Sequence, residues 1–192
     1  MMKRAMRGVL LGMFALVFGT TQPAWGEGNV FAGLDLGAAV PTGKSDDRLA
    51  TGGTFSPYVS YMWNDFLGLI AQAQVVGFPN ENRPGIRDKD ATWAFGFHAG
   101  PRIAEPFSAG GMELEAYQTF QVGVFTGLSG DTPISRTSWG FSTGGGLNWK
   151  LNELASVGVW ARYNSLDQRV NPTNNVEFVT TGVGLTYLLP AQ

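Results

Sequence analysis

The sequence predicts an all-β fold, an eight-stranded antiparallel up-and-down transmembrane β-barrel that follows a cleaved signal peptide. Three observations predict it. Apolar and small polar residues alternate in segments of about ten residues, which is typical of barrel strands. The links between these segments are alternately short and long, as in barrels with turns at one end and loops at the other. Charged residues gather in the links and are rare in the segments themselves.

Residues 1–26 are predicted to be a secretory signal peptide. Three basic residues, the last of them Arg7, precede an apolar run from Val9 to Phe18, and Ala24 and Gly26 follow as a small-x-small pair. A basic start, a short apolar run and a small-residue cleavage position define such peptides. The run is too short to span a membrane comfortably as a helix. We therefore expect cleavage after Gly26 and a single barrel domain over residues 27–192.

The first four strand segments alternate apolar residues with Gly, Ser, Gln and Asp. Aromatic and β-branched residues supply the apolar positions, as strands prefer. The segments read NVFAGLDLGAAV near 29–40, TFSPYVSYMWN near 54–64, FLGLIAQAQVVGF near 66–78 and TWAFGFHAGP near 92–101.

The last four segments repeat the pattern with more glycine. They read GMELEAYQTFQVGVF near 111–125, a segment near 137–149 that contains WGFSTGGGLNW, LASVGVWARYN near 154–164 and VEFVTTGVGLTYL near 176–188. Short links join the second segment to the third (Asn64-Asp65), the fourth to the fifth (RIAEPFSAG) and the sixth to the seventh (KLNE). The long links are PTGKSDDRLATGG, PNENRPGIRDKDA, TGLSGDTPISR and SLDQRVNPTNN.

The distribution of charge decides which face meets lipid. A membrane barrel is apolar outside and polar inside, whereas a soluble ligand-binding barrel has a charged exterior rich in lysine and glutamate. Only five charged residues lie in the segments, and all but Glu177 fall on the small, glycine-rich face. That face is therefore predicted to be the lumen, and the protein is expected in the bacterial outer membrane. The predicted lumen polar network is Asp35, His98, Glu113, Glu115 and Arg162, with Arg102 reaching Glu113.

Large aromatic residues stand at the ends of the apolar face. Trp139 and Trp149 share a face because their spacing is even. Ten residues of tilted strand rise roughly 25 Å, the height of the apolar band of such barrels. The predicted membrane-interface aromatics are Phe55, Trp63, Trp93, Trp139, Trp149 and Tyr187.

Four residues depart from this face assignment. Gln118 falls on the lipid face, and a bulge in the fifth segment would explain it. Phe66, Ile70 and Trp160 fall in the lumen, and the alternation offers no reason for them.

The chain resembles the small outer-membrane β-barrel domain proteins of the OmpA-like and OmpX-like eight-stranded group over residues 27–192. The resemblance is clearest in GGGLNWKLNELASVGVWARYN and in NNVEFVTTGVGLTYLL. It implies outer-membrane lipid and lipopolysaccharide as surroundings, and assembly by the barrel assembly machinery. The chain departs from the group at its end, where five residues follow Tyr187, so the terminal aromatic signal for assembly is weakened.

Composition and spacing exclude several chemistries. The predicted mature chain is acidic and offers no basic patch for nucleic acid. It has no cysteine, and the charged loop runs have no metal-ligand spacing, so we expect no metal and no cofactor. His98 is the single histidine, and the residue two positions on is Gly100 rather than serine. A hydrolase needs a nucleophile, a base and an orienting carboxylate within hydrogen-bond reach.

The sequence therefore predicts a monomeric, non-enzymatic outer-membrane barrel. Its role would be structural or surface-interacting, its lumen polar and plugged, and any extracellular partner would bind through the long loops. The alternatives are a lipid A-modifying barrel enzyme, a narrow channel and a soluble ligand-binding barrel.

Overall fold

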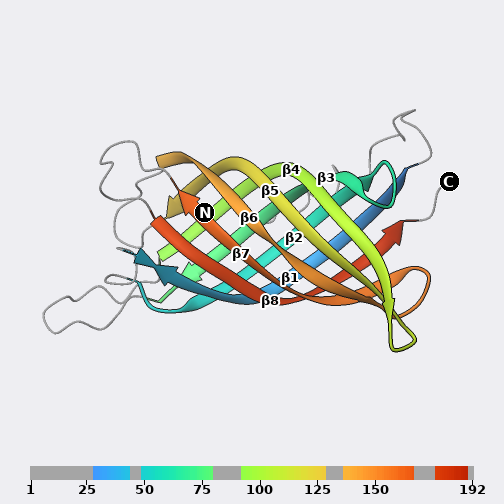
Figure 1. Cartoon of the computed structure of the whole chain (residues 1–192). Coiled ribbons are helices and arrows are strands. Elements are labelled where there is room, and N and C mark those ends of the chain that lie inside the picture. Colours follow the sequence, from blue (N-terminus) through green and yellow to red (C-terminus); the bar gives the residue numbers. More distant parts are fainter. Residues whose placement is uncertain (1–27, 44–48, 80–91, 129–135, 167–175, 190–192) are drawn as a thin grey trace, which may run out of the picture.

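The computed structural model describes residues 28–43, 49–79, 92–128, 136–166 and 176–189, which form one closed barrel of eight antiparallel strands (Figure 1). The predicted fold class is confirmed. None of these residues belongs to a helix long and apolar enough to cross a membrane. The predicted signal peptide and much of the four long links (44–48, 80–91, 129–135 and 167–175) lie outside the described residues. The strands are β1 (Asn29–Thr42), β2 (Gly52–Met62), β3 (Leu67–Phe78), β4 (Thr92–Ala109), β5 (Met112–Leu128), β6 (Arg136–Lys150), β7 (Ala155–Leu166) and β8 (Val176–Leu189).

The strands are staggered around the barrel by ten residues. Paired residues can be followed from Trp139 in β6 through β5, β4 and every further strand, and this path returns to β6 at Trp149. Stagger, strand number and tilt are linked, and such a barrel has strands tilted by about 40° and an interior just wide enough for side chains to fill. The spacing of the two tryptophans therefore equals the stagger of the barrel.

The link expected between the fourth and fifth strands is wrong. Most of RIAEPFSAG is strand, because β4 continues to Ala109 and β5 starts at Met112. The turn consists of Gly110 and Gly111, with φ values of 60° and 79°. Two consecutive residues with positive φ make the tight hairpin turn that suits strand twist, and glycine adopts that conformation without strain. The β4–β5 hairpin consequently extends past the other turns at this end of the barrel (Figure 1).

The other two short turns share one device, an asparagine that caps the backbone. Asn64 Oδ1 accepts hydrogen bonds from the backbone N–H groups of Phe66 and Leu67, at 2.9 and 2.7 Å. Asn152 Oδ1 accepts from the N–H groups two and three residues further on, at 2.9 and 2.8 Å. Asparagine commonly stabilises turns in this way. Phe66 lies in the first of these turns with 57% of its surface exposed, so its predicted place in the lumen is wrong.

Apolar side chains cover the outer surface, and small or polar side chains fill the inside. Val159, Val183 and Leu185 are more than half exposed, whereas Asp35 and Arg162 are 1% exposed. Ile70 and Trp160 do point into the lumen, as predicted. Gln118 is exposed on the outside without the expected bulge, because β5 keeps one register with β6 along its length. The apolar exterior and polar interior are those of a membrane barrel.

The glycines of β6 explain the composition of the WGFSTGGGLNW segment. A Cβ atom on Gly144 would lie 2.9 Å from Cγ of Arg162, and one on Gly146 would lie 2.8 Å from the hydroxyl of Tyr117. Both distances are too short for a side chain, so these glycines leave the space that large lumen residues of β5 and β7 occupy.

Candidate functional site

The lumen is the candidate site, and its side chains form three layers along the barrel axis. The charged layer contains two ion pairs, one near the middle of the barrel and one near the turn end. The polar layer lies in the middle and consists mainly of amides and hydroxyls around His98. The apolar cap closes the loop end and consists of Ala39, Val76, Phe78, Phe125, Leu166 and Phe178.

The first ion pair crosses the lumen between strands that are not neighbours. Arg162 Nη2 of β7 lies 2.7 Å from Asp35 Oδ2 of β1, and β8 separates these strands. Both side chains are 1% exposed. The Arg162 guanidinium also lies over the ring of Trp160, 4.7 Å from its centre. A buried carboxylate is costly without a partner, so Arg162 is what allows Asp35 to be charged here.

The second ion pair joins Arg102 of β4 to Glu115 of β5. Asn148 Nδ2 donates a further hydrogen bond of 2.9 Å to the same carboxylate oxygen. Arg102 is buried and stacks over Tyr117, whereas the Glu115 side chain is 23% exposed. Water therefore reaches this pair from the turn end, which makes it weaker than the pair at Asp35.

The predicted contact between Arg102 and Glu113 is wrong. Glu113 pairs instead with Lys150, at 3.0 Å, and the two side chains are 68% and 53% exposed. The reason is the length of the β4–β5 hairpin, which carries Glu113 beyond the end of the lumen. Glu113 therefore does not join Asp35, Glu115 and Arg162 inside the barrel.

His98 lies in the polar layer and is buried. Its Nδ1 atom shares a hydrogen bond with Gln121 Oε1, and its ring stacks on Phe125 with centres 5.4 Å apart. Within the described part of the chain, these contacts bring neither a hydroxyl nor a carboxylate to the imidazole. That arrangement supplies neither the nucleophile nor the orienting acid that hydrolysis needs. The described residues likewise contain no group of three or more His, Asp or Glu placed to hold a metal ion.

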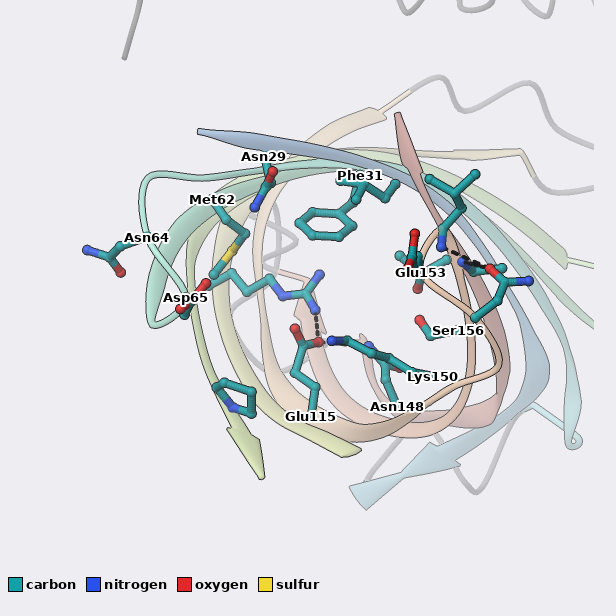
Figure 2. A pocket seen from close by; sticks show the side chains of 17 residues that line it. Asn29, Phe31, Met62, Asn64, Asp65, Glu115, Asn148, Lys150, Glu153 and Ser156 are labelled. Carbon is teal, nitrogen blue, oxygen red and sulfur yellow. Dashed lines mark hydrogen bonds and ion pairs between the residues drawn. The ribbon is translucent and has the colours of Figure 1, made fainter. Parts of the chain in front are cut away.

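At the turn end the lumen opens into a cavity of about 180 Å³, called here the mouth cavity (Figure 2). Arg102, Glu115 and Asn148 lie at its floor, and Phe31 and Met62 form part of its wall. The two capped turns contribute Asn64, Asp65, Asn152 and Glu153 to its lining.

The apolar cap is the part of the lumen that sequence reasoning missed. Phe78 and Phe178, from β3 and β8, meet edge to face with ring centres 5.4 Å apart. A signal was present, because Phe78 shares the parity of Gln72 and Gln74, and Phe125 shares that of Gln121. These phenylalanines are in phase with the polar face, and only their place at the loop ends of the strands distinguishes them.

The six predicted interface aromatics all lie on the outer surface and are 43–56% exposed. Three stand towards the loop ends of their strands and three at the turn ends. Their contact with the membrane interface stays a prediction. The loop-end residues are Phe55, Trp93 and Trp139, and the turn-end residues are Trp63, Trp149 and Tyr187.

These features define a transmembrane β-barrel, with an apolar exterior and a polar, filled interior. The chain belongs to the outer membrane protein beta-barrel domain family, whose sequence model matches residues 9–188. It is accordingly a protein of the bacterial outer membrane. No curated protein sequence matches it.

Solved structures of the same fold are similar to this chain. The neisserial surface protein A (NspA) is 17% identical with a TM-score of 0.51, and the match covers 83% of this chain and 96% of that one. The outer membrane protein OprG of Pseudomonas aeruginosa is 15% identical with a TM-score of 0.51, covering 85% and 97%. The outer membrane enzyme PagL is 19% identical with a TM-score of 0.43, covering 84% and 99%. The similarity concerns the fold, which hosts more than one function.

Proposed function

We propose that this protein is a non-enzymatic outer-membrane barrel with a closed lumen and a structural or surface-interaction role. The filling of the lumen supports the proposal most directly. The largest fully buried side chains include Arg162, Phe78, Phe125 and Phe178, and they project into the lumen from different sides of the barrel. An eight-stranded barrel is just wide enough for its own side chains, so an open pore through the barrel would have to displace these residues.

The outer surface supports a structural role in the membrane. Its apolar face and its aromatic residues at both ends match the hydrocarbon core and the two interfaces of a bilayer. The proposed surroundings are outer-membrane lipid and lipopolysaccharide, after insertion by the barrel assembly machinery. We propose a monomer, with the long loops as the surface for any extracellular partner.

A narrow channel is the alternative that conductance measurements test. The purified protein is refolded into a planar lipid bilayer, and the current is recorded in about 1 M salt, which favours detection of small currents. We expect a membrane that stays closed, as the empty bilayer does. Stable current steps in the wild-type protein would overturn the closed lumen.

A lipid A-modifying enzyme is the other alternative, and His98 provides its test. His98→Ala should leave the acyl pattern of lipid A unchanged relative to the wild type, because the imidazole contacts an amide and a phenyl ring rather than a catalytic group. Mass spectrometry of lipid A from cells expressing each protein, with empty-vector cells as control, measures this. A pattern that differs between wild-type and empty-vector cells and reverts with His98→Ala would show catalysis.

A further inference from the structure

Two different structures could close the lumen, the ion pairs of the charged layer or the apolar cap. The ion pairs lie near the middle and the turn end of the barrel, whereas the cap lies at the loop end. They would block water and ions for different physical reasons. Charged groups attract water, and a dry apolar constriction excludes it.

The cap is built by residues from most sides of the barrel. Its members come from five strands, β1, β3, β5, β7 and β8, and none is more than 6% exposed. The Phe125 ring lies against the two flanking strands, since a Cβ atom on Gly140 would come 3.0 Å from its Cε2. A glycine on each flanking strand, Gly96 and Gly140, leaves the ring its space. Removing this ring would therefore open a gap on the β5 side of the cap.

The polar layer directly below the cap contains buried polar side-chain atoms that have no hydrogen-bond partner within the described ranges. Buried polar groups in folded proteins are almost always satisfied, by protein or by ordered water, and a water needs two to four such partners. These atoms include Gln72 Nε2 and Oε1, Gln74 Oε1, His98 Nε2, Gln121 Nε2 and Ser142 Oγ.

Polar and charged side chains continue from the mouth cavity towards the polar layer. The mouth cavity reaches Arg102 and Glu115, and the partly exposed Glu115 carboxylate is solvated there. Beyond this pair lie Asp35 and the unpartnered nitrogens of Arg162. The charges in these layers balance, two of each sign, so neither cations nor anions are repelled by a net field.

We propose that the apolar cap alone seals the lumen, and that the lumen below it is a blind, hydrated chamber open to the turn end. The inference deepens the proposed closed barrel, on which it rests, by assigning closure to Phe78, Phe125 and Phe178. The ion pairs then serve stability and not closure. Loss of the cap would convert the barrel into a path for water and small ions.

Silver ion, which is close to water in size and reacts with thiols, tests the chamber from each side. The chain has no cysteine, so Ser142→Cys introduces a single buried thiol just below the cap. The protein is refolded into vesicles, and protease cleavage of the loops identifies the side that faces outward. We expect silver to block the thiol from the turn side and not from the loop side. Blocking from the loop side, or from neither side, would overturn the proposal.

Conductance of cap and ion-pair variants gives the second test. Phe125→Ala combined with Phe178→Ala should produce current and let silver reach the introduced thiol from the loop side. Phe95→Ala is the matched control, because Phe95 lies on the outside near the same level and is 37% exposed. The double variant Asp35→Asn, Arg162→Gln should stay closed.

The outcomes separate the two proposals. Current through the wild-type protein would refute the closed barrel itself. A closed wild type, together with current in the ion-pair variant and none in the folded cap variant, would refute the cap as the seal. Heat-modifiable gel mobility establishes that each variant is folded, and Phe125→Val provides a milder change if the alanine variants do not fold.

Discussion

Arg162 is predicted to contribute more to the stability of the barrel than any exposed ion pair, because it neutralises a fully buried carboxylate. Arg162→Met keeps most of the length of the side chain and its contact with Trp160 but removes the charge. Asp35, at 1% exposure, is then left without its partner. Removing one member of a buried pair costs about 3–5 kcal/mol, and the free energy of unfolding should fall by that amount.

The size of this effect follows from burial rather than from distance. The exposed pair Lys150–Glu113 has a similar separation, 3.0 Å against 2.7 Å for Arg162–Asp35. Water screens the exposed pair, so Lys150→Met should cost less than about 1 kcal/mol. The double variant Asp35→Leu, Arg162→Met removes both buried charges, and a well-filled apolar replacement of such a pair is often neutral or stabilising. The double variant should therefore regain most of what Arg162→Met loses.

Urea unfolding of the protein folded in phospholipid vesicles measures these changes, with tryptophan fluorescence and heat-modifiable gel mobility as two readouts. The single and double variants form a thermodynamic cycle, and the coupling between Asp35 and Arg162 should reach several kcal/mol by the argument above. Two results would refute the reasoning. One is a loss for Arg162→Met no larger than that for Lys150→Met. The other is that the losses for Asp35→Leu alone and Arg162→Met alone add up to the loss for the double variant within about 0.5 kcal/mol, which indicates independent sites.

The remaining predictions concern the two faces of β7. Val159 is 58% exposed on the outer surface. Val159→Arg should therefore cost about 2–4 kcal/mol and impair refolding into bilayers, while Val159→Leu should not. Equal refolding yields for the two variants would contradict the face assignment. Gly158 faces inward, where a Cβ atom would lie 2.6 Å from the carbonyl oxygen of Leu147, so Gly158→Ala should lower the midpoint of urea unfolding. An unchanged midpoint would show that the two strands can move apart at little cost.

The sequence was sufficient to predict the barrel and its faces because alternation and charge are local signals. Asp35, His98, Glu115 and Arg162 fall inside, as their parity requires. The β4–β5 link was mispredicted for an equally local reason. Glu105 and Pro106 interrupt the apolar pattern, and neither is typical of a strand. The first residue of β3 pairs with Ile103, so β4 has run past the end of β3 where Glu105 and Pro106 lie. No residue of β3 is paired with Pro106 on that side, and the missing N–H of the proline therefore breaks no ladder hydrogen bond there.

The partners of the charged residues could not be predicted in the same way. Parity puts a side chain inside the barrel, but it does not give its height along the axis. Asp35 and Arg162 meet across β8, and that meeting depends on the register of three strands together. Glu113 shares its parity with Glu115 and still lies outside the lumen, because the length of the hairpin decides where the lumen ends.

The stagger of the barrel determines the height of each lumen side chain along the barrel axis. It also relates the spacing of Trp139 and Trp149 to the layers inside. Moving from β6 towards β5 and on around the barrel, each paired residue lies nearer the turn end, until the path has descended from Trp139 to Trp149.

On this path the cap residue Phe125 lies one position from Val124, the partner of Trp139, and hence level with the loop-end aromatic residues. Glu115 lies next to Leu114, the partner of Trp149, and hence level with the turn-end aromatic residues. The apolar cap therefore lies at one predicted membrane interface and the solvated ion pair at the other, with the polar layer and Asp35–Arg162 between them. Because the Asp35–Arg162 pair is buried at the depth of the hydrocarbon core, removing one of its two members is expected to lower the stability of the barrel strongly.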